Sequence, residues 1–262
     1  MNYREFAVSV AKEAGNLLMR HYGKMQKLEW KLATNFKTQV DDESDKLIRE
    51  RIKENFPRHN IYSEEQDAIE QKSEYNWVID PLDGTIPYAY GISDHFTVCV
   101  ALVRNKTPIL GVTYAPKRKE LYVAEKGKGA SCNGEKITSS LEDELNHAII
   151  ALEGGKATKF FNRKSIVPYV KNFYGNDGVV CALSSGCASV PLALVASGKM
   201  HAYVALSLEP WDMAAGVILN REVGNMVTTI YGKDWELGDE SIVAANQKMH
   251  EEVMRLVRKS QQ

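Results

Sequence analysis

Two acids, Asp80 and Asp83, stand three residues apart in the segment "WVIDPLDGT" (residues 77–85), where a predicted buried strand ends. Pro81 prevents this strand from continuing as a central ladder partner and Gly84 permits a tight turn, so both carboxylates can turn toward the same side. Asp-Pro and Asp-Gly are also common turn formers, and a plain turn is the simpler interpretation of the isolated segment. Two neighbouring carboxylates are equally suited to holding a cation.

A predicted helix start follows these acids directly. Thr85 and Ile86 precede Pro87, and Pro at the first helical position after a Thr or Ile cap is typical of a helix N-terminus. The backbone N–H groups of Gly84 and Thr85 would then point into the same mouth as the carboxylates, where a phosphate can bind. Carboxylates beside a phosphate require cations between them, and hard oxygen ligands suit Mg²⁺. The segment therefore predicts a magnesium-dependent phosphate site.

Two further acidic positions can complete such a site. Glu64 and Glu65 follow a short apolar stretch in "IYSEEQD", and Asp212 opens a predicted helix in "LEPWDMAAG". Each has a simpler interpretation when taken alone, because an exposed Glu pair is usually solvated surface and an Asp at a helix start is usually a cap. They become evidence for a metal site because they occur together with Asp80 and Asp83, in this order along one chain.

The elements that must position these acids follow from the apolar pattern. Apolar residues at helical spacing predict an amphipathic helix over residues 3–22 and a second one over about 41–55, closed by Pro57. The segments "WVID", "HFTVCVALV", "PILGVTYAP" and "ELYVAEKG" have strand character and are separated by turn residues. They predict an antiparallel meander that begins with the acid-bearing strand.

After about residue 138, strands and helices alternate. "HAIIALEG", "HAYVAL" and "SIVAAN" have strand character, whereas "SVPLALVASG", "WDMAAGVILNREVG" and residues 247–258 have helix character. Such alternation favours a layered α/β second half. The chain contains no repeat or linker-like stretch, so we predict one domain over 1–262 with subdomains of about 1–138 and 139–262.

Composition narrows the class of protein. The 262 residues are 44% hydrophobic, enough for a substantial core, and 33 basic side chains nearly balance 34 acidic ones. No global field would attract a nucleic acid polymer or an anionic membrane. The N-terminus lacks a continuous apolar signal region, and no apolar run approaches about 18 residues, so we expect a cytoplasmic, unanchored protein. The four cysteines lack CxxC spacing and are expected to be reduced packing thiols.

The acidic motifs resemble those of the inositol monophosphatase family of metal-dependent, lithium-sensitive sugar phosphatases, a superfamily that includes fructose-1,6-bisphosphatases. The family's "GEE"-type site, "DPxDGT" and "WDxAAG" are matched, in order, by residues 63–65, 80–85 and 211–216. Its "VTxxD" element is matched more loosely, with Asp41 in the place of the aspartate. The glycine-punctuated meander "ILGVTYAPKRKELYVAEKGKGASCNGEKI" also fits, and the resemblance extends from about residue 3 to 250.

The resemblance implies an α/β (α+β) fold, a layered α-β-α-β-α sandwich, with two or three Mg²⁺ ions. The residues that it assigns to the metals are Glu64, Asp80, Leu82 through its carbonyl, Asp83 and Asp212. One ion would lie on Glu64, Asp80 and the Leu82 carbonyl, and a second on Asp80, Asp83 and Asp212. A third, looser ion would contact Glu64 and Glu65 through water.

The same resemblance implies hydrolysis of a phosphomonoester by a metal-activated water. Asp41, Glu64 and Thr85 are the implied catalytic residues, with Thr85 and Asp41 orienting the water and accepting its proton. The implied substrate contacts are Asp83, Gly84, Thr85, Glu209 and Asp212. The expected partner is a small sugar or polyol phosphate such as inositol monophosphate, and members of the family are commonly homodimers.

The sequence departs from the family pattern on the leaving-group side. Residues 86–88 read Ile-Pro-Tyr where members usually have a segment like Thr-Asn-Phe, and residues 186–188 read Gly-Cys-Ala in place of "GSA". Ala205 stands where inositol-specific members place a glutamate that binds sugar hydroxyls, and Glu209 is the nearest substitute. The substrate's leaving group is therefore open, while the metal residues are retained.

A basic segment over residues 154–164 also bears on the substrate. Its ordinary interpretation is a solvated loop, but its lysines and arginine can recognise a second phosphate, and its two phenylalanines can stack on a base. Fructose 1,6-bisphosphate, histidinol phosphate and a nucleoside 3′,5′-bisphosphate are accordingly alternative substrates. The basic and aromatic residues concerned are Lys156, Lys159, Phe160, Phe161, Arg163 and Lys164.

The alternative outside enzymes is a regulatory binding scaffold that keeps the fold without turnover. The retention of Thr85 and every metal carboxylate argues against it, because like charges held close together are unfavourable without bound cations.

Overall fold

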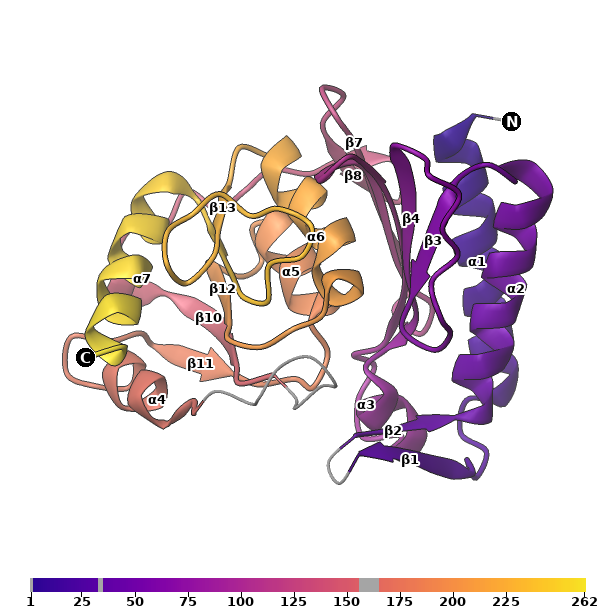
Figure 1. The fold of residues 1–262 in the computed structure, drawn as a ribbon. Coiled ribbons are helices and arrows are strands. Elements are labelled where there is room, and N and C mark those ends of the chain that lie inside the picture. The colour runs from indigo at the N-terminus through magenta and orange to yellow at the C-terminus, as the bar shows by residue number, and fades with distance from the viewer. Residues whose placement is uncertain (1, 33–34, 156–164) are drawn as a thin grey trace.

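The computed structural model describes residues 2–32, 35–155 and 165–262, and their helices and strands stack in five layers, α-β-α-β-α (Figure 1). The α/β sandwich expected from the sequence is confirmed. In the described part of the chain, no helix combines the length and the apolar character that crossing a bilayer requires.

The larger sheet belongs to the first half of the chain and carries the acid-bearing strand. Its first two strands are parallel and all other neighbours are antiparallel, so the predicted meander is confirmed. In pairing order its strands are β3 (Asn60–Ser63), β4 (Tyr75–Asp83), β5 (Thr97–Arg104), β6 (Thr107–Ala115), β7 (Glu120–Glu125), β8 (Ala130–Cys132) and β9 (Glu135–Lys136).

Two helices, α1 (Tyr3–His21) and α2 (Gln39–Asn55), cover the outer face of this sheet (Figure 1). Their apolar faces pack against its strands in one buried cluster that includes Trp77. The second helix begins two residues before the predicted start because Thr38 caps it: the Thr38 hydroxyl accepts from the Val40 amide at 3.2 Å. The two helices therefore hold the acid-bearing strand from behind.

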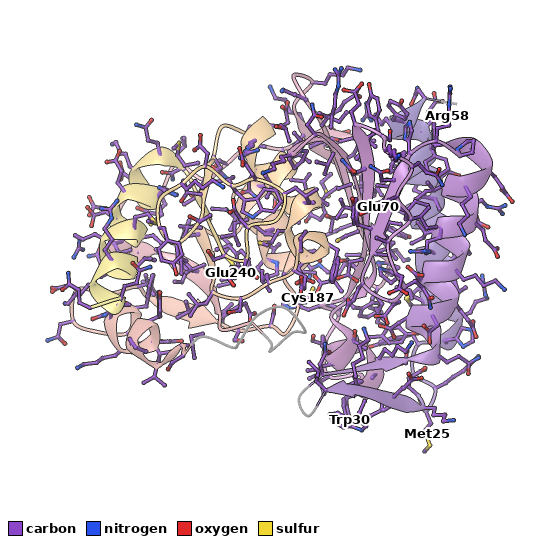
Figure 2. All side chains as sticks on the ribbon, viewed as in Figure 1. Met25, Trp30, Arg58, Glu70, Cys187 and Glu240 are labelled. Carbon is purple, nitrogen blue, oxygen red and sulfur yellow. The ribbon has the colours of Figure 1, made fainter. Side chains whose placement is uncertain are left out.

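A short antiparallel hairpin of β1 (Leu28–Leu32) and β2 (Asn35–Thr38) precedes α2. The Trp30 and Phe36 rings meet edge to face across it, with centroids 5.2 Å apart. Figure 2 shows Trp30 at the outer rim of the molecule, and its side chain is largely exposed. The sequence analysis missed this hairpin because its strands are only five and four residues long, although apolar and charged residues do alternate in β1.

The smaller sheet belongs to the second half, and its predicted strands are confirmed. It has a parallel core, in which β10 pairs with both β11 and β12, and an antiparallel remainder. In pairing order the strands are β11 (Cys181–Leu183), β10 (Ile149–Glu153), β12 (Ala202–Ala205), β14 (Ile242–Ala245) and β13 (Met226–Thr228). The two three-residue strands at its edges were not predicted, because so short a segment carries little periodicity.

Helices α5 (Ser189–Ala196) and α6 (Pro210–Glu222) form the middle layer between the sheets (Figure 1). Glycines permit this close packing. A Cβ at Gly111 of β6 would lie 2.4 Å from Cγ2 of Ile218, and one at Gly216 would lie 2.5 Å from Cδ1 of Leu192. The small residues of "WDMAAG" therefore seat α6 tightly enough to bring its first turn to the end of β4.

Short elements complete the architecture. The last layer contains α7 (Gln247–Ser260) and α4 (Val167–Phe173), which pack beside the smaller sheet, and the single turn η1 (Leu145–His147) lies before β10. After β4 comes α3 (Thr85–Tyr90), capped by Gly84 with φ of 84°. The prediction that Pro87 opens this helix is wrong, because the left-handed turn at Gly84 already starts it at Thr85.

Candidate active site

A cavity of about 550 Å³ opens where the two halves of the chain meet. It lies at the end of β4 and at the carboxyl ends of the parallel strands β10 and β12, where α/β folds commonly bind ligands. Of the described residues that the family resemblance assigned to metals, catalysis or substrate, Asp41 and Glu65 do not line it, and the lining ones are Glu64, Asp80, Leu82, Asp83, Gly84, Thr85, Glu209 and Asp212. The structure thus brings together residues that are up to 148 positions apart (212 − 64).

A β-bulge explains how two acids three residues apart reach one cavity. Between Asp80 and Asp83 the three steps of β4 pair with only two steps of β5, from Cys99 to Thr97. In a regular strand, residues at i and i+3 point to opposite faces, and the extra residue restores the same face. The bulge is held by the Leu82 amide, which donates to Asp80 Oδ1 at 3.0 Å.

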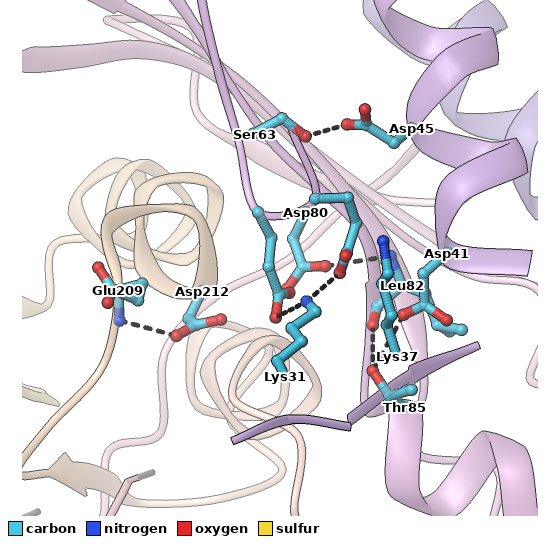
Figure 3. Close-up of polar contacts among 12 residues, drawn as sticks. Lys31, Lys37, Asp41, Asp45, Ser63, Asp80, Leu82, Thr85, Glu209 and Asp212 are labelled. Carbon is cyan, nitrogen blue, oxygen red and sulfur yellow. Dashed lines mark hydrogen bonds and ion pairs between the residues drawn. The ribbon is translucent and has the colours of Figure 1, made fainter. Parts of the chain in front are cut away.

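Three carboxylates converge on one point. Glu64, Asp80 and Asp212 each place an oxygen within 4.8 Å of the other two, and Figure 3 shows Asp80 and Asp212 approaching from β4 and α6. Burial, together with the charges of Glu64, Asp83 and Asp212, raises the pKa of Asp80 well above its ordinary value. Asp80 Oδ2 is buried without a hydrogen-bond partner among the described residues. A cation would remove both the repulsion and the unpaired acceptor.

Asp83 points toward the middle layer instead. Its carboxylate accepts from the Ser189 amide at 2.7 Å, the Ala188 amide at 3.3 Å and the Cys187 thiol at 3.1 Å, and also from the Ser189 hydroxyl. Figure 2 shows Cys187 at the junction of the two halves. Asp83 therefore links β4 to the start of α5, and it lines the cavity beside the three-carboxylate cluster without belonging to it. Its role as a metal ligand stays a prediction.

Thr85 and Asp41 are adjacent, as the sequence predicted for a catalytic pair. The Thr85 hydroxyl lies 3.2 Å from both Asp41 Oδ1 and the Leu82 carbonyl oxygen (Figure 3). Asp41 lies behind Thr85 and accepts from the Thr38 amide at 2.8 Å and the Thr38 hydroxyl at 2.6 Å. Burial raises the pKa of Asp41 to about 6, although these Thr38 hydrogen bonds lower it. Such a carboxylate can exchange a proton near neutral pH.

The hairpin adds a residue that sequence reasoning missed. Lys31 of β1 extends its ammonium into the acidic cluster, 3.1 Å from Glu64 Oε1 and 2.5 Å from Glu65 Oε1 (Figure 3). Burial lowers the pKa of Lys31, but the two glutamates outweigh it and raise the pKa above its ordinary value. The ammonium is thus a cation already present beside Glu64. No spacing signal pointed to it, because its placement depends on the unpredicted hairpin.

The leaving-group residues are placed differently. Glu209 caps α6, and its amide donates to Asp212 Oδ2 at 2.8 Å, so it both lines the cavity and orients a member of the cluster. Ala205 is fully buried at the end of β12 and is not among the lining residues. The basic and aromatic residues predicted as substrate contacts, Lys156, Lys159, Phe160, Phe161, Arg163 and Lys164, lie outside the described residues.

Comparison with known proteins decides the family. The sequence model of the Inositol monophosphatase family matches residues 2–262. This chain belongs to the inositol monophosphatase family. The resemblance inferred from the acidic motifs is therefore confirmed over nearly the whole chain.

Relatives within the family carry two kinds of name. A Thermotoga maritima protein named fructose-1,6-bisphosphatase/inositol-1-monophosphatase is 32% identical over 260 residues, which cover 98% of this chain and 96% of the relative. An Escherichia coli K12 protein named Nus factor SuhB is 34% identical over 250 residues, or 93% of this chain and 91% of the relative.

Solved structures agree with the fold. The T. maritima IMPase superimposes with a TM-score of 0.88 at 31% identity, covering 99% of this chain and 98% of that one. The extragenic suppressor protein suhB of Bartonella henselae gives a TM-score of 0.90 at 28% identity, covering 97% and 98%. Membership in the inositol monophosphatase family supports a phosphatase fold, with the acidic cavity as its candidate active site.

Proposed function

We propose that this member of the inositol monophosphatase family is a Mg²⁺-dependent phosphomonoesterase that acts on a small phosphate ester. One observation carries the proposal: Glu64, Asp80 and Asp212 converge within 4.8 Å of one another around a buried, unpartnered oxygen of Asp80. An all-oxygen donor set of this kind fits Mg²⁺, which binds through a few carboxylates together with phosphate oxygens of the substrate. Two or three ions, as the family resemblance implies, remain part of the proposal.

The residues would divide the work as follows. Glu64, Asp80 and Asp212 would hold the metal, with the Leu82 carbonyl and Asp83 beside them. Bound Mg²⁺ would supply a lowered water pKa and would offset charge on the phosphoryl oxygens. Gly84 and Thr85, at the start of α3, would receive the phosphate next to the metal residues.

Thr85 and Asp41 would act on the attacking water. The Thr85 hydroxyl would orient it, and the Asp41 carboxylate, 3.2 Å from that hydroxyl, would take its proton. The water oxygen forms a bond to phosphorus while the P–O bond of the ester breaks. The leaving alkoxide takes up a proton from solvent, to which Asp41 returns the proton that it accepted, and the products are an alcohol and inorganic phosphate.

A non-enzymatic scaffold is the second candidate, because relatives 32–34% identical to this chain are named as Nus factors. A scaffold would gain nothing from burying Asp80 among carboxylates whose charges add to the rise of its pKa, and this favours the enzyme. The homodimer and the cytoplasmic location expected from the sequence belong to the same proposal.

Phosphate release from a panel of esters tests the function. The panel contains inositol monophosphate, fructose 1,6-bisphosphate, histidinol phosphate and adenosine 3′,5′-bisphosphate, each with and without Mg²⁺ and with added Li⁺. We expect Mg²⁺-dependent release from at least one ester and inhibition by Li⁺. Mg²⁺ binding without release from any ester would favour the scaffold.

A further inference from the structure

Glu64 differs from the other two acids of the cluster in how its backbone is held. Asp80 lies within β4 and Asp212 in the first turn of α6, whereas Glu64 is the first residue after β3. The pairing of β3 with β4 ends at Ser63 and Ile79, so Glu64 lies beyond the paired part of the sheet. A ligand on a loop needs supporting contacts to stay within reach of a shared cation.

Helix α2 holds this loop at both of its ends. The Asp45 carboxylate accepts a hydrogen bond from the Ser63 hydroxyl, just before the loop (Figure 3). One helical turn later, Arg49 Nη2 donates to the Asp67 carbonyl oxygen at 2.9 Å, just after it. Because residues four apart lie on the same face of a helix, the two contacts act side by side. We call Asp45 and Arg49 the α2 clamp.

The same helix also contacts the segment that carries Asp80. The Ser44 hydroxyl donates to the Pro81 carbonyl oxygen at 2.9 Å, inside the bulge between Asp80 and Asp83. Ser44 is fully buried and stands next to the clamp in the chain. One rigid helix therefore contacts both the Glu64 loop and the bulge, and it can fix the separation of the two acids that face each other across the cluster.

The clamp is a poor arrangement for stability alone. Asp45 is fully buried and Arg49 is 9% exposed, yet Asp45 Oδ2 and Arg49 Nη1 have no hydrogen-bond partner among the described residues. Asp45 Oδ2 lies 3.7 Å from Arg49 Nε, which is longer than a hydrogen bond. A buried ion pair of this kind commonly stabilises a fold less than apolar residues of similar size. Apolar residues could not hold the Ser63 hydroxyl and the Asp67 carbonyl, which favours a positioning role.

We propose that Asp45 and Arg49 are positioning residues, which hold the loop after β3 so that Glu64 reaches the cation proposed to lie between it, Asp80 and Asp212. The inference rests on the proposed Mg²⁺-dependent function and adds to it two residues that do not line the cavity. They act on the metal site through the backbone of residues 63–67 and not by contact with the metal or the substrate.

Calorimetric titration of Mg²⁺ into substrate-free protein tests the clamp at each of its two contacts. Ser63→Ala removes the hydroxyl that Asp45 holds, and Arg49→Met removes the donor to the Asp67 carbonyl. Residues that orient a metal ligand typically contribute about tenfold or more to metal affinity. We expect the Kd for Mg²⁺ to rise by about that factor in each variant. The Mg²⁺ concentration for half-maximal phosphate release should rise by the same factor, with a smaller change in the rate at saturating Mg²⁺.

A matched control lies two residues away on α2. Arg51→Met makes the same change at a side chain that is 46% exposed and pairs with Glu13 and Glu54, away from the loop. We expect the Kd for Mg²⁺ to be unchanged in this variant. Thermal melting shows which variants fold. Because Arg49→Met leaves the buried Asp45 carboxylate without its cation, Ser63→Ala, which keeps the ion pair, decides the question if Arg49→Met does not fold.

The outcomes for the inference and for the proposed function are distinct. If wild type binds Mg²⁺ and the folded clamp variants bind it equally well, the clamp is structural only, even where the melting temperature falls, and the proposed function stands. An equal rise of the Kd in Arg51→Met also overturns the inference, because the effect would then not depend on the loop. If wild type neither binds Mg²⁺ nor releases phosphate, the proposed function fails and the inference fails with it.

Discussion

The acidic cluster and the apolar side of the cavity are built in different ways. We call this apolar side the apolar arm, and its residues are Leu152, Ile166, Val170, Tyr174, Ala182 and Leu183. The cluster gathers Glu64, Asp80 and Asp212 from three separate segments, and Asp80 is 1% exposed. The arm comes from residues 152–183 of the second half, and Val170 and Tyr174 on it are 39% and 56% exposed. Buried carboxylates need a defined geometry and a cation, whereas partly exposed apolar residues can be substituted one at a time without loss of the fold. The cluster therefore determines which reaction is catalysed, and the arm can determine which substrate is bound.

The same contrast concerns stability. Burial of carboxylates opposes folding of the metal-free protein, as the raised pKa values of Asp80 and Asp41 show, and the charges of neighbouring carboxylates add to the effect of burial. The residues of the arm contribute little to the core because several of them stay exposed. We expect changes in the cluster to affect turnover and stability in opposite directions, and changes in the arm to affect substrate choice alone.

The largest expected effect is that of Asp80→Asn. The several kcal/mol of transition-state stabilisation that a bound metal supplies corresponds to about 10³-fold in turnover, and we expect at least this loss. The melting temperature of the metal-free protein should rise, because a buried carboxylate with an unpartnered oxygen is removed. Initial-rate assays and thermal melting measure the two effects.

Asp83→Asn is the matched comparison. Its carboxylate accepts from Cys187, Ala188 and Ser189, so we expect this variant to lose stability where Asp80→Asn gains it. A fall in melting temperature for both variants would contradict the distinction between the two acids.

The second effect concerns pH and Asp41. A carboxyl whose pKa rises from 3.8 to about 6 on folding stabilises the protein below pH 3.8 and loses that contribution as the pH rises through 6. The difference corresponds to about 3 kcal/mol, or roughly 6–12 °C in melting temperature. Relative to Asp41→Asn, metal-free wild type should therefore become less stable between about pH 4 and 6 and then stay level. A constant difference from pH 4 to 7 would show that Asp41 titrates normally.

The third effect is the loss of the Lys31 ammonium. Lys31→Gln leaves the Glu65 side chain, which is 1% exposed, without its partner, and we expect the metal-free protein to lose about 2 kcal/mol. Added Mg²⁺ should restore much of this loss. Lys37→Gln is the control, because Lys37 pairs with the more exposed Asp42 and such pairs contribute about 0–1 kcal/mol. Equal losses in the two variants would place Lys31 among ordinary surface pairs.

The smallest effect is expected in the arm. Val170→Asn should change the free energy of unfolding by no more than about 0.5 kcal/mol, because the side chain is 39% exposed. Denaturant unfolding measures it. A loss of several kcal/mol would mean that this residue belongs to the core, and that the arm is not free to vary independently of the fold.

Particular residues show how far the sequence could be interpreted. Asp80 and Asp83 were found because they lie close in the chain within a specific motif, and the antiparallel meander followed from apolar runs between turns. Lys31 was missed because the contact between a lone lysine of a five-residue strand and residues 33 and 34 positions away leaves no local pattern. The start of α3 was misplaced because the conformation of Gly84 outweighed the usual position of proline. The arm was invisible because its residues have ordinary types and meet only in the fold.

The central claim is that Glu64, Asp80 and Asp212 form a Mg²⁺ site, and calorimetric titration of Mg²⁺ into wild type and Asp80→Asn tests it most directly. We predict saturable binding to wild type that is strongly weakened in a folded Asp80→Asn variant. Equal binding to the two proteins, or no binding to wild type, would contradict the claim.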